Sequence, residues 1–453
     1  MSDTIFALST SPGRAGIAVL RISGPAAGQA LNALCGGPLP QARRASLRSL
    51  TDPDSGAVID RGLVLWFPAP HSFTGEDLVE LQVHGGAAVI AALASALARQ
   101  PGLRPGEAGE FTRRAFDAGK LDLTQVEGLA DLIAAETEAQ RRQALRQMDG
   151  ALSRVFADWA VRLTRMLAQL EAYLDFPDED LPVERAQAID DEILCLENEI
   201  DQYLVGSASG ERLRSGVEIA ILGPPNAGKS SLLNALAQRD AAIISETAGT
   251  TRDVVEVQLD LGGFPATLAD TAGLRALSQS DAQSDAQSDI EREGIRRAKA
   301  RAERADLQIA VFDLSAGAEL DPETLAVIGP DALVVLNKAD LAPEGSGVDL
   351  AGRETFILSV KTGAGVGAFL AALEARVAEA LSTALTAPSL TRARHRHALQ
   401  ACRAALARAG EAELPELEAE DLRVALRALG RITGKVDVED LLDVIFREFC
   451  IGK

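Results

Sequence analysis

The stretch that decides the fold is GPPNAGKS, residues 223–230. It fits the pattern G-x-x-x-x-G-K-[ST], in which backbone N–H groups of a glycine-rich loop surround phosphate oxygens. The apolar run VEIAILG (217–223) precedes the loop and SLLNALAQ (231–238) follows it, so a predicted strand leads into a predicted helix. This is the context that the motif requires. It predicts a nucleotide site in which Lys229 reaches the β- and γ-phosphates and Ser230 binds Mg²⁺.

Four further motifs follow in the order that a guanine nucleotide site needs: GTTRD (249–253), DTAG (270–273), NKAD (337–340) and SVK (359–361). The Asp340 carboxylate can accept hydrogen bonds from guanine N1–H and from the 2-amino group, and adenine lacks both donors. GTP is selected over ATP because the wrong base would leave a buried charge unpaired. The sequence therefore predicts a GTPase.

Each motif has an expected part in this site. Asp270 can hold Mg²⁺ through water, and the Gly273 N–H can meet the γ-phosphate. Thr250 or Thr251 can bind Mg²⁺ when that phosphate is present. The predicted GTP-binding residues are Asn226, Ala227, Gly228, Lys229, Ser230, Ser231, Ser245, Thr250, Thr251, Asp270, Thr271, Ala272, Gly273, Asn337, Lys338, Asp340, Ser359, Val360 and Lys361.

The residue after DTAG is Leu274, where many small GTPases have the Gln that orients the attacking water. Either hydrolysis is slow until a partner assists, or an acidic side chain elsewhere orients the water. The acidic candidates are Asp289, Glu291 and Glu293, for which a solvated charge at a helix start is the competing interpretation. They follow or end a tandem polar repeat, QSDAQSDAQSD (279–289), which we interpret as a lengthened loop without chemistry of its own.

The chain has 453 residues, too many for a single core, so we expect several domains. Residues 1–119 mix short apolar strands with glycines and predict an α+β N-terminal domain. Residues 214–379 alternate apolar strands with helices and predict an α/β domain with a parallel sheet. Helical spacing dominates 120–213 and 380–453, so these segments are expected to pack as one discontinuous all-α domain into which the α/β domain is inserted. Between the first helical segment and the α/β domain, GSASGERLRSG (206–216) is interpreted as a linker.

Composition argues against several classes of protein. The net charge of −21 disfavours a chain-wide nucleic-acid binder, since affinity for phosphates comes from clustered Lys and Arg. Four Cys without C-x-x-C spacing argue against a structural zinc site or a disulfide framework and fit a reducing cytosol, so a cytoplasmic location is expected. No signal peptide is evident, and the most apolar stretch, 87–98, is too short to span a bilayer and predicts a buried helix.

The whole chain resembles the MnmE (TrmE) family of tRNA-modification GTPases. The resemblance rests on the domain order and on the segments SPGRAGIAVLRISG (11–24), WFPAPHSFTGEDLVELQVHGG (66–86), FTRRAFDAGKLDLTQVEGLADLI (111–133), GPPNAGKSSLLNALAQRDAAIIS (223–245), AGTTRD (248–253), DTAGLR (270–275) and CIGK (450–453). It implies a GTP hydrolase that works with a flavoprotein partner, MnmG (GidA). Together they would install an aminomethyl or carboxymethylaminomethyl group at C5 of the wobble uridine of certain tRNAs.

The resemblance also implies a folate site in the N-terminal domain, which would form the homodimer as well. The one-carbon unit would come from 5-formyltetrahydrofolate or a related tetrahydrofolate, and the family's folate positions match Arg21, Glu80, Lys120 and Lys453. A pterin edge suits a carboxylate, and the glutamyl carboxylates of a folate suit Lys and Arg. Without the resemblance, Arg21 and Lys120 would be interpreted as ordinary surface charges.

Potassium and the catalytic acid are likewise implied by the resemblance. The implied K⁺ ligands are Asn226, Ser245, Thr247 and Thr250, and the implied Mg²⁺ ligands are Ser230 and Thr251. A monovalent cation there would supply the positive charge that an arginine finger otherwise brings. In the family, two GTPase domains meet across this loop during turnover, so hydrolysis would be K⁺-stimulated and coupled to their dimerisation. The acid that orients the water matches Glu291.

Some interpretations stay open. The locally basic stretch RARHRHALQACRAALARAG (392–410) would either contact tRNA phosphates or form a solvated helix face. For Cys450, a buried position at a helix end is favoured over a reactive thiol. Two other functions compete with the leading one. They are a ribosome-assembly or RNA-surveillance GTPase whose N-terminal domain only docks partners, and a folate-binding transferase that carries a regulatory GTPase.

Overall fold

The structure, a computed structural model, describes residues 3–175, 183–238, 242–243, 257–268, 304–317, 320–343, 350, 352–386, 389–436, 439–447, 449 and 451–452. The chain forms two compact units. One is made of Met1–Ala130, Gln147–Arg162 and Leu426–Lys453, and the other of Asp131–Arg146 and Leu163–Ala425. Both units therefore combine segments that lie far apart in the sequence.

The first unit is built on a sheet that has six strands among the described residues, in the order β3-β4-β5-β2-β1-β6. The strands are β1 (Thr4–Leu8), β2 (Ala15–Ser23), β3 (Ser46–Thr51), β4 (Val58–Phe67), β5 (Leu78–Gly85) and β6 (Leu103–Pro105). β6 runs parallel to β1, and the other neighbours are antiparallel. Helices that lie wholly or mostly in this unit are α1 (Ala27–Cys35), α2 (Ala87–Ala98), α3 (Glu110–Asp117), α4 (Leu123–Ala134) and α16 (Glu439–Arg447).

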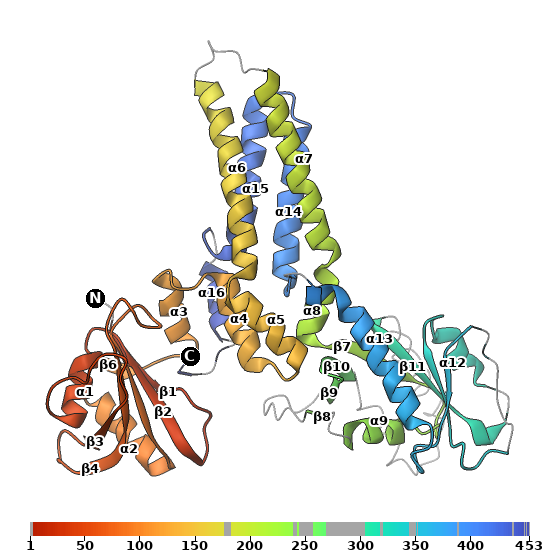
Figure 1. The fold of residues 1–453 in the computed structure, drawn as a ribbon, viewed down its shortest axis with the longest axis horizontal. Helices are drawn as coiled ribbons and strands as arrows, with labels where there is room; N and C mark the ends of the chain where they lie inside the picture. Colours follow the sequence, from red (N-terminus) through yellow and green to blue (C-terminus); the bar gives the residue numbers. More distant parts are fainter. Residues whose placement is uncertain are drawn as a thin grey trace, which may run out of the picture. The chain divides into compact units, whose positions relative to one another are not determined.

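The two faces of this sheet differ in chemistry. Leu20 and Ile22 of β2 are buried in a core that α1 and α2 cover, and Figure 1 shows both helices against the sheet. Arg21 lies on the opposite face, because side chains alternate along a strand with a period of two. Glu80 of β5 lies opposite Arg21 in the strand pairing and shares that face. One face is therefore apolar, and the other carries the charged side chains of Arg21 and Glu80 beside a smaller apolar cluster of Ile5, Ala7 and Phe111.

The second unit contains a sheet with seven strands among the described residues, in the order β13-β12-β11-β7-β10-β9-β8. The strands are β7 (Val217–Leu222), β8 (Ala242–Ile243), β9 (Val257–Leu261), β10 (Phe264–Leu268), β11 (Leu307–Asp313), β12 (Leu333–Asn337) and β13 (Thr355–Ile357). Neighbours from β13 to β10 are parallel, and β9 and β8 extend the sheet antiparallel. The helices beside it are α9 (Lys229–Gln238), α12 (Pro322–Val327) and α13 (Val366–Thr386), and a 3-10 turn, η1 (Leu314–Ala316), follows β11.

Apolar cores lie on both faces of the seven-stranded sheet. Leu232 of α9 and Phe369 of α13 belong to one core, and Phe312 of β11 and Leu314 of η1 belong to the other. All five residues of β12 are buried, as expected for a parallel strand that is covered on both faces. The sheet is therefore the middle layer of an α/β domain.

Long helices make up the rest of the second unit. They are α5 (Glu138–Met148), α6 (Ala151–Asp175), α7 (Val183–Val205), α8 (Ser207–Ser215), α14 (Ala393–Gly410) and α15 (Pro415–Thr433), of which α5, α6 and α15 also contribute residues to the first unit. Figure 1 shows α7 and α14 side by side. Since α7 precedes the α/β domain in the sequence and α14 follows it, the helical domain is discontinuous. The predicted fold class is confirmed, while the boundaries at 119, 213 and 379 stay predictions.

The segment at 206–216 differs from its prediction. The sequence predicts a linker, but Ser207–Ser215 form α8. Gly210 permits close packing, because a Cβ there would lie 2.2 Å from the Leu390 carbonyl oxygen. Leu213 is fully buried in the core of the α/β domain. Tertiary contacts therefore stabilise a helix that Gly and Ser disfavour by propensity.

The most apolar stretch forms α2, with the bounds that the sequence predicts, and Leu93 and Leu97 are fully buried. Within the described ranges, no helix is both long enough and apolar enough to cross a membrane.

Gly109, at the start of α3, should tolerate no side chain. Its φ is +72°, and a Cβ there would lie 2.3 Å from the Phe446 carbonyl oxygen of α16. Gly109→Ala is expected to add left-handed strain of about 1–2 kcal/mol. The overlap with Phe446 should cost about 1–3 kcal/mol more. The thermal unfolding midpoint of the variant should therefore fall.

Gly102→Ala is the matched control. Gly102 has a φ of +76°, and no described atom lies within 4 Å of the position that a Cβ would take. This variant should show only the left-handed strain. Equal unfolding midpoints for the two variants would contradict the close approach of α16 to α3.

Candidate functional site

The phosphate loop joins β7 to α9 and depends on two glycines. Gly223 has a φ of +142°, and a Cβ there would lie 2.1 Å from the Val311 carbonyl oxygen. Gly228 has a φ of +101°, and a Cβ there would lie 2.1 Å from Nδ2 of Asn337. Between them, Asn226 adopts a left-handed conformation, with a φ of +62°. The loop therefore lies tightly against β11 and β12, and only glycine fits at both positions.

Lys229 is the first residue of α9, and its side chain folds over the loop. Nζ donates hydrogen bonds to the carbonyl oxygens of Gly223 and Pro224, each at 2.7 Å. Burial lowers the pKa of Lys229, and the Asp321 carboxylate opposes this shift only in part. A buried ammonium group whose charge is only partly balanced by a carboxylate is suited to bind an anionic ligand such as phosphate.

Asn337 connects three of the predicted motifs. Its Nδ2 donates a hydrogen bond to the Ala227 carbonyl oxygen at 3.0 Å, and its Oδ1 accepts one from the Val360 N–H at 3.1 Å. The residue is 3% exposed. The NKAD motif therefore contacts both the phosphate loop and SVK. These two motifs lie more than a hundred residues apart in the sequence.

Asp340 stands at the edge of this arrangement. Its Oδ1 accepts a hydrogen bond from Ser359 Oγ at 2.6 Å, and Ser359 is almost fully buried. The Ser359 hydroxyl also accepts from the Thr362 N–H at 3.2 Å, which fixes its position. Among the described residues, Oδ2 of the carboxylate has no partner. An oriented carboxylate with a free oxygen can accept hydrogen bonds from a base.

Asp313, at the end of β11, is a site residue that sequence reasoning missed. Its Oδ2 accepts a hydrogen bond from Lys338 Nζ at 2.6 Å, and its Oδ1 accepts from the Ser315 N–H at 3.0 Å. Burial raises the pKa of the Asp313 carboxyl, but the bonds from Lys338 and Ser315 outweigh this effect and hold the pKa below its usual value. Lys338 itself has a φ of +62°, so the ion pair fixes a side chain on a strained backbone.

Ser230 and Ser231 are exposed at the start of α9, and their hydroxyl groups have no partner among the described residues. The described structure thus brings together residues 226–231, 337–340 and 359–361. Other predicted residues lie outside the described ranges, namely Ser245, Thr247, Thr250, Thr251, Asp270, Thr271, Ala272, Gly273, Leu274, Asp289, Glu291 and Glu293, together with the repeat at 279–289. Within those ranges, no cluster of three or more His, Cys, Asp or Glu side chains could hold a metal ion.

A second candidate site lies on the charged face of the six-stranded sheet. Arg21 Nη2 and Nε both approach Oε1 of Glu80, at 2.8 and 3.2 Å. The guanidinium carbon of Arg21 lies 5.4 Å from the centroid of the Phe73 ring and 5.8 Å from that of Phe111. Cation–π contacts and the ion pair therefore hold the guanidinium in one orientation. Nη1 of Arg21 and Oε2 of Glu80 have no partner in the described parts of the chain.

Lys120 and the C-terminal residues lie near this face. Lys120 Nζ donates to the Pro70 carbonyl oxygen at 2.6 Å, and a Cβ on Gly75 would lie 3.4 Å from its Cε. Ser9 Oγ donates to the Gly452 carbonyl oxygen at 2.9 Å. Lys453, which follows Gly452, lies outside the described residues. Phe73 and Phe111 lie in segments that carry the family resemblance, but no pattern in the sequence signals their contacts with Arg21.

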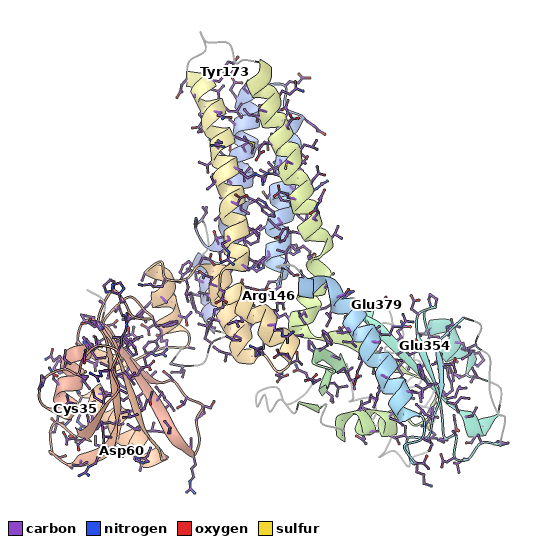
Figure 2. The ribbon with its side chains drawn as sticks, in the orientation of Figure 1. Cys35, Asp60, Arg146, Tyr173, Glu354 and Glu379 are labelled. Carbon is purple, nitrogen blue, oxygen red and sulfur yellow. The ribbon has the colours of Figure 1, made fainter. Side chains whose placement is uncertain are left out.

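Cys35 and Cys402 do not suggest thiol chemistry. Cys35 of α1, labelled in Figure 2, is half-buried, and burial raises the pKa of its thiol to about 11 against a small opposite effect of Arg48. Cys402 is fully buried, which raises its pKa to about 12. Both thiols therefore stay protonated at neutral pH. Cys450 lies outside the described residues.

Two protein families match the chain. The MnmE helical domain family matches residues 123–450, and the family described as GTP-binding protein TrmE N-terminus matches residues 4–120. The tRNA modification GTPase MnmE of Parvibaculum lavamentivorans is 57% identical over 457 residues, which cover 100% of both chains. The chain belongs to the MnmE family. The identification made from the sequence is confirmed.

Other relatives match along all or most of their length. The tRNA modification GTPase MnmE of Paramagnetospirillum magneticum is 55% identical, with 100% of both chains covered. The mitochondrial 5-taurinomethyluridine-[tRNA] synthase subunit GTPB3 of Homo sapiens is 49% identical, over 99% of this chain and 93% of that protein. The predicted enzyme class is confirmed, since this MnmE-family chain is a GTPase.

The basic stretch at 392–410 of this MnmE-family chain is largely ion-paired. Its arginines bind carboxylates of neighbouring helices: Arg392 with Asp131 at 3.0 Å, Arg396 with Glu211 at 2.9 Å, Arg403 with Asp201 at 2.6 Å and Arg408 with Asp421 at 2.6 Å. These charges are compensated within the protein, which favours the helix-face interpretation over a phosphate-binding patch.

Asp313→Asn should weaken GTP binding about fivefold, because a partly exposed ion pair with Lys338 contributes roughly 1 kcal/mol. Asn keeps an oxygen for the Ser315 N–H, so the change removes the charge and leaves the turn. Calorimetric titration with a non-hydrolysable GTP analogue measures the effect. Glu323→Gln, at an exposed residue without a side-chain partner among the described residues, is the control. Unchanged affinity in Asp313→Asn would show that Lys338 needs no such positioning.

Proposed function

We propose that this GTPase modifies the wobble uridine of certain tRNAs at C5, adding an aminomethyl or carboxymethylaminomethyl group. The observation that carries the proposal is the match along the full length of relatives that are named tRNA modification GTPases. The human relative's name specifies a uridine of tRNA and a subunit of a synthase. That name supports uridine as the modified base and supports the need for a partner protein. We propose that this partner is the flavoprotein MnmG (GidA).

The phosphate loop and the NKAD and SVK motifs are proposed to bind GTP. Lys229 would exchange its two backbone carbonyl partners for phosphate oxygens, and Asp340 would accept from guanine. Asn337 supports this assignment because it holds the loop and SVK at a fixed separation. A preorganised site binds with less loss of conformational entropy.

The residues near the loop fit the two cations that GTP hydrolysis is proposed to use. Ser230 offers an exposed hydroxyl for Mg²⁺ with Thr251, and Asn226 offers an exposed side-chain carbonyl for K⁺ with Ser245, Thr247 and Thr250. Bound there, the cations would neutralise charge that develops on the phosphates. Asn226 lacks a partner among the described residues, which leaves its side chain available for this role.

The chain is further proposed to act as a homodimer in the cytoplasm, with GTP hydrolysis coupled to dimerisation of the GTPase domains. Glu291 is the proposed residue that orients the attacking water, because Leu274 cannot. Its position follows from the family resemblance alone.

The charged face of the six-stranded sheet is proposed to bind a tetrahydrofolate that donates the one-carbon unit. Among the described residues, Arg21 has N–H groups without a partner and Glu80 has such an oxygen, which suit a carboxylate and a pterin edge respectively. Lys120 and Lys453 complete the proposed set. The contact between Ser9 and Gly452 supports the participation of the C-terminal lysine, since it brings the preceding residue to β1.

The tRNA assignment is tested by mass spectrometry of tRNA nucleosides from cells that lack the gene. Wild-type protein and Glu323→Gln should restore the C5-modified wobble uridine, and Lys229→Ala, which removes the phosphate-binding ammonium, should not. Intact modification without the gene would overturn the proposed function. Restoration by Lys229→Ala would separate modification from nucleotide binding.

The folate assignment is tested by calorimetry with 5-formyltetrahydrofolate. Arg21→Ala should weaken binding at least tenfold, about 1.4 kcal/mol, because it removes a charge-assisted contact to the ligand. Arg61→Ala, on β4 of the same sheet but exposed and without a side-chain partner among the described residues, should bind as the wild type does. Equal affinity in both variants would remove Arg21 from the site.

A further inference from the structure

Helix α8 carries charged residues that contact three different elements. Successive residues of an α-helix are about 100° apart, so Glu211, Arg212 and Arg214 project in three directions. Each forms an ion pair within the second unit. A nine-residue helix between the long α7 and the strand β7 thus touches the sheet, α4 and α14 at once.

Arg212 binds α8 to the sheet. Its Nε lies 2.6 Å from Oδ1 of Asp306, the residue before β11. Asp306 is itself fixed, because its Oδ2 accepts from the Glu218 N–H at 3.0 Å and its own N–H donates to the Glu218 carbonyl oxygen at 2.9 Å. The pair therefore reaches the backbone of β7, the strand that leads into the phosphate loop.

The end of α8 also contacts β10. Thr267 Oγ1 donates to the Ser215 carbonyl oxygen at 3.2 Å. Gly216 has a φ of +90°, and a Cβ there would lie 2.6 Å from Thr267 Oγ1. Thr267 precedes Asp270 of DTAG by three residues, so α8 is attached to the strand that leads into the predicted γ-phosphate motif.

Arg214 binds α8 to α4. Its Nε lies 2.9 Å from Oδ1 of Asp131, and Nη2 of Arg392 lies 3.0 Å from the same oxygen. Asp131 is largely buried, with a side-chain exposure of 13%. One carboxylate therefore joins α4, α8 and the residue that caps α14.

Glu211 binds α8 to α14. Its Oε1 accepts from Arg396 Nε at 2.9 Å and its Oε2 from Arg396 Nη2 at 3.4 Å. Two further bonds fix the helix between its neighbours: Ser209 Oγ donates to the Ala380 carbonyl oxygen at 3.2 Å, and Gln140 Nε2 donates to the Arg214 carbonyl oxygen at 3.0 Å.

The attachments of α8 differ in kind. Leu213 is fully buried in the apolar core of the α/β domain, which is costly to separate. The links to Asp131 and Arg396 are polar, and Arg214 and Arg396 remain 37% and 33% exposed. The Glu211–Arg396 pair is partly exposed on both sides, so it can exchange with water at small cost and repack during a conformational change. Helix α8 is therefore held by the α/β domain through an apolar core and linked to α4 and α14 by ion pairs.

We infer that α8 couples the nucleotide state of the GTPase domain to the helical domain. Displacement at the end of β10 would move α8 with the sheet, and the pairs of Arg214 and Glu211 would carry that movement to α4 and α14. This role goes beyond the proposed function and does not require tRNA or folate.

The test compares hydrogen exchange of the full-length chain bound to GDP and to a non-hydrolysable GTP analogue. In the wild type, exchange in α14 should change with the nucleotide. The double variant Arg214→Gln/Arg396→Gln should lose more than half of that change, while the phosphate loop still responds. Affinity for the analogue should stay within about twofold, since neither residue lies at the nucleotide.

Arg408→Gln is the matched control, because its pair with Asp421 also lies on α14 but does not involve α8. It should keep the full response. If the double variant has a lowered melting temperature, the single variants Arg214→Gln and Arg396→Gln, each of which removes one link to the helical domain, decide by the same comparison. A wild-type α14 that does not respond to the nucleotide, or variants that keep the full response, would overturn the inference.

Discussion

The buried side-chain amide of Asn337 is the contact on which the nucleotide site depends. It donates to the phosphate loop at Ala227 and accepts from Val360, so it fixes the separation between the predicted phosphate and base positions before any nucleotide binds. Only glycine at 228 allows the loop to come so close. An apolar side chain in place of this amide would leave the Val360 N–H without its partner, at a cost of about 1–3 kcal/mol.

The sequence leaves the basic stretch at 392–410 open between a tRNA contact and a solvated helix face. In the structure, four of its arginines meet carboxylates of α4, α7, α8 and α15. Positive charge in α14 therefore positions helices against one another. We therefore expect the proposed tRNA contact elsewhere in the chain or on the proposed flavoprotein partner.

The sequence predicted those features that depend on neighbouring residues in the chain. A continuous apolar run marks β12 as a buried strand, and the glycines and Lys229 define the phosphate loop, so both are found without a structure. It did not predict α8, because Gly210 and the serines resemble a linker until the contact with Leu390 is seen. Asp313 was not predicted for a related reason, because a single acidic residue at the end of a strand forms no recognisable motif. Its role depends on the ion pair with Lys338, which lies 25 residues away in the sequence.

The central proposal is that the tRNA modification requires the coupling between the GTPase domain and the helical domain that α8 provides. The most direct measurement supplies Arg214→Gln/Arg396→Gln to cells that lack the gene and quantifies their C5-modified wobble uridine, alongside GTP turnover of the purified protein. The account predicts hydrolysis at the wild-type rate and loss of the modified nucleoside. Wild-type amounts of the modified nucleoside would contradict it.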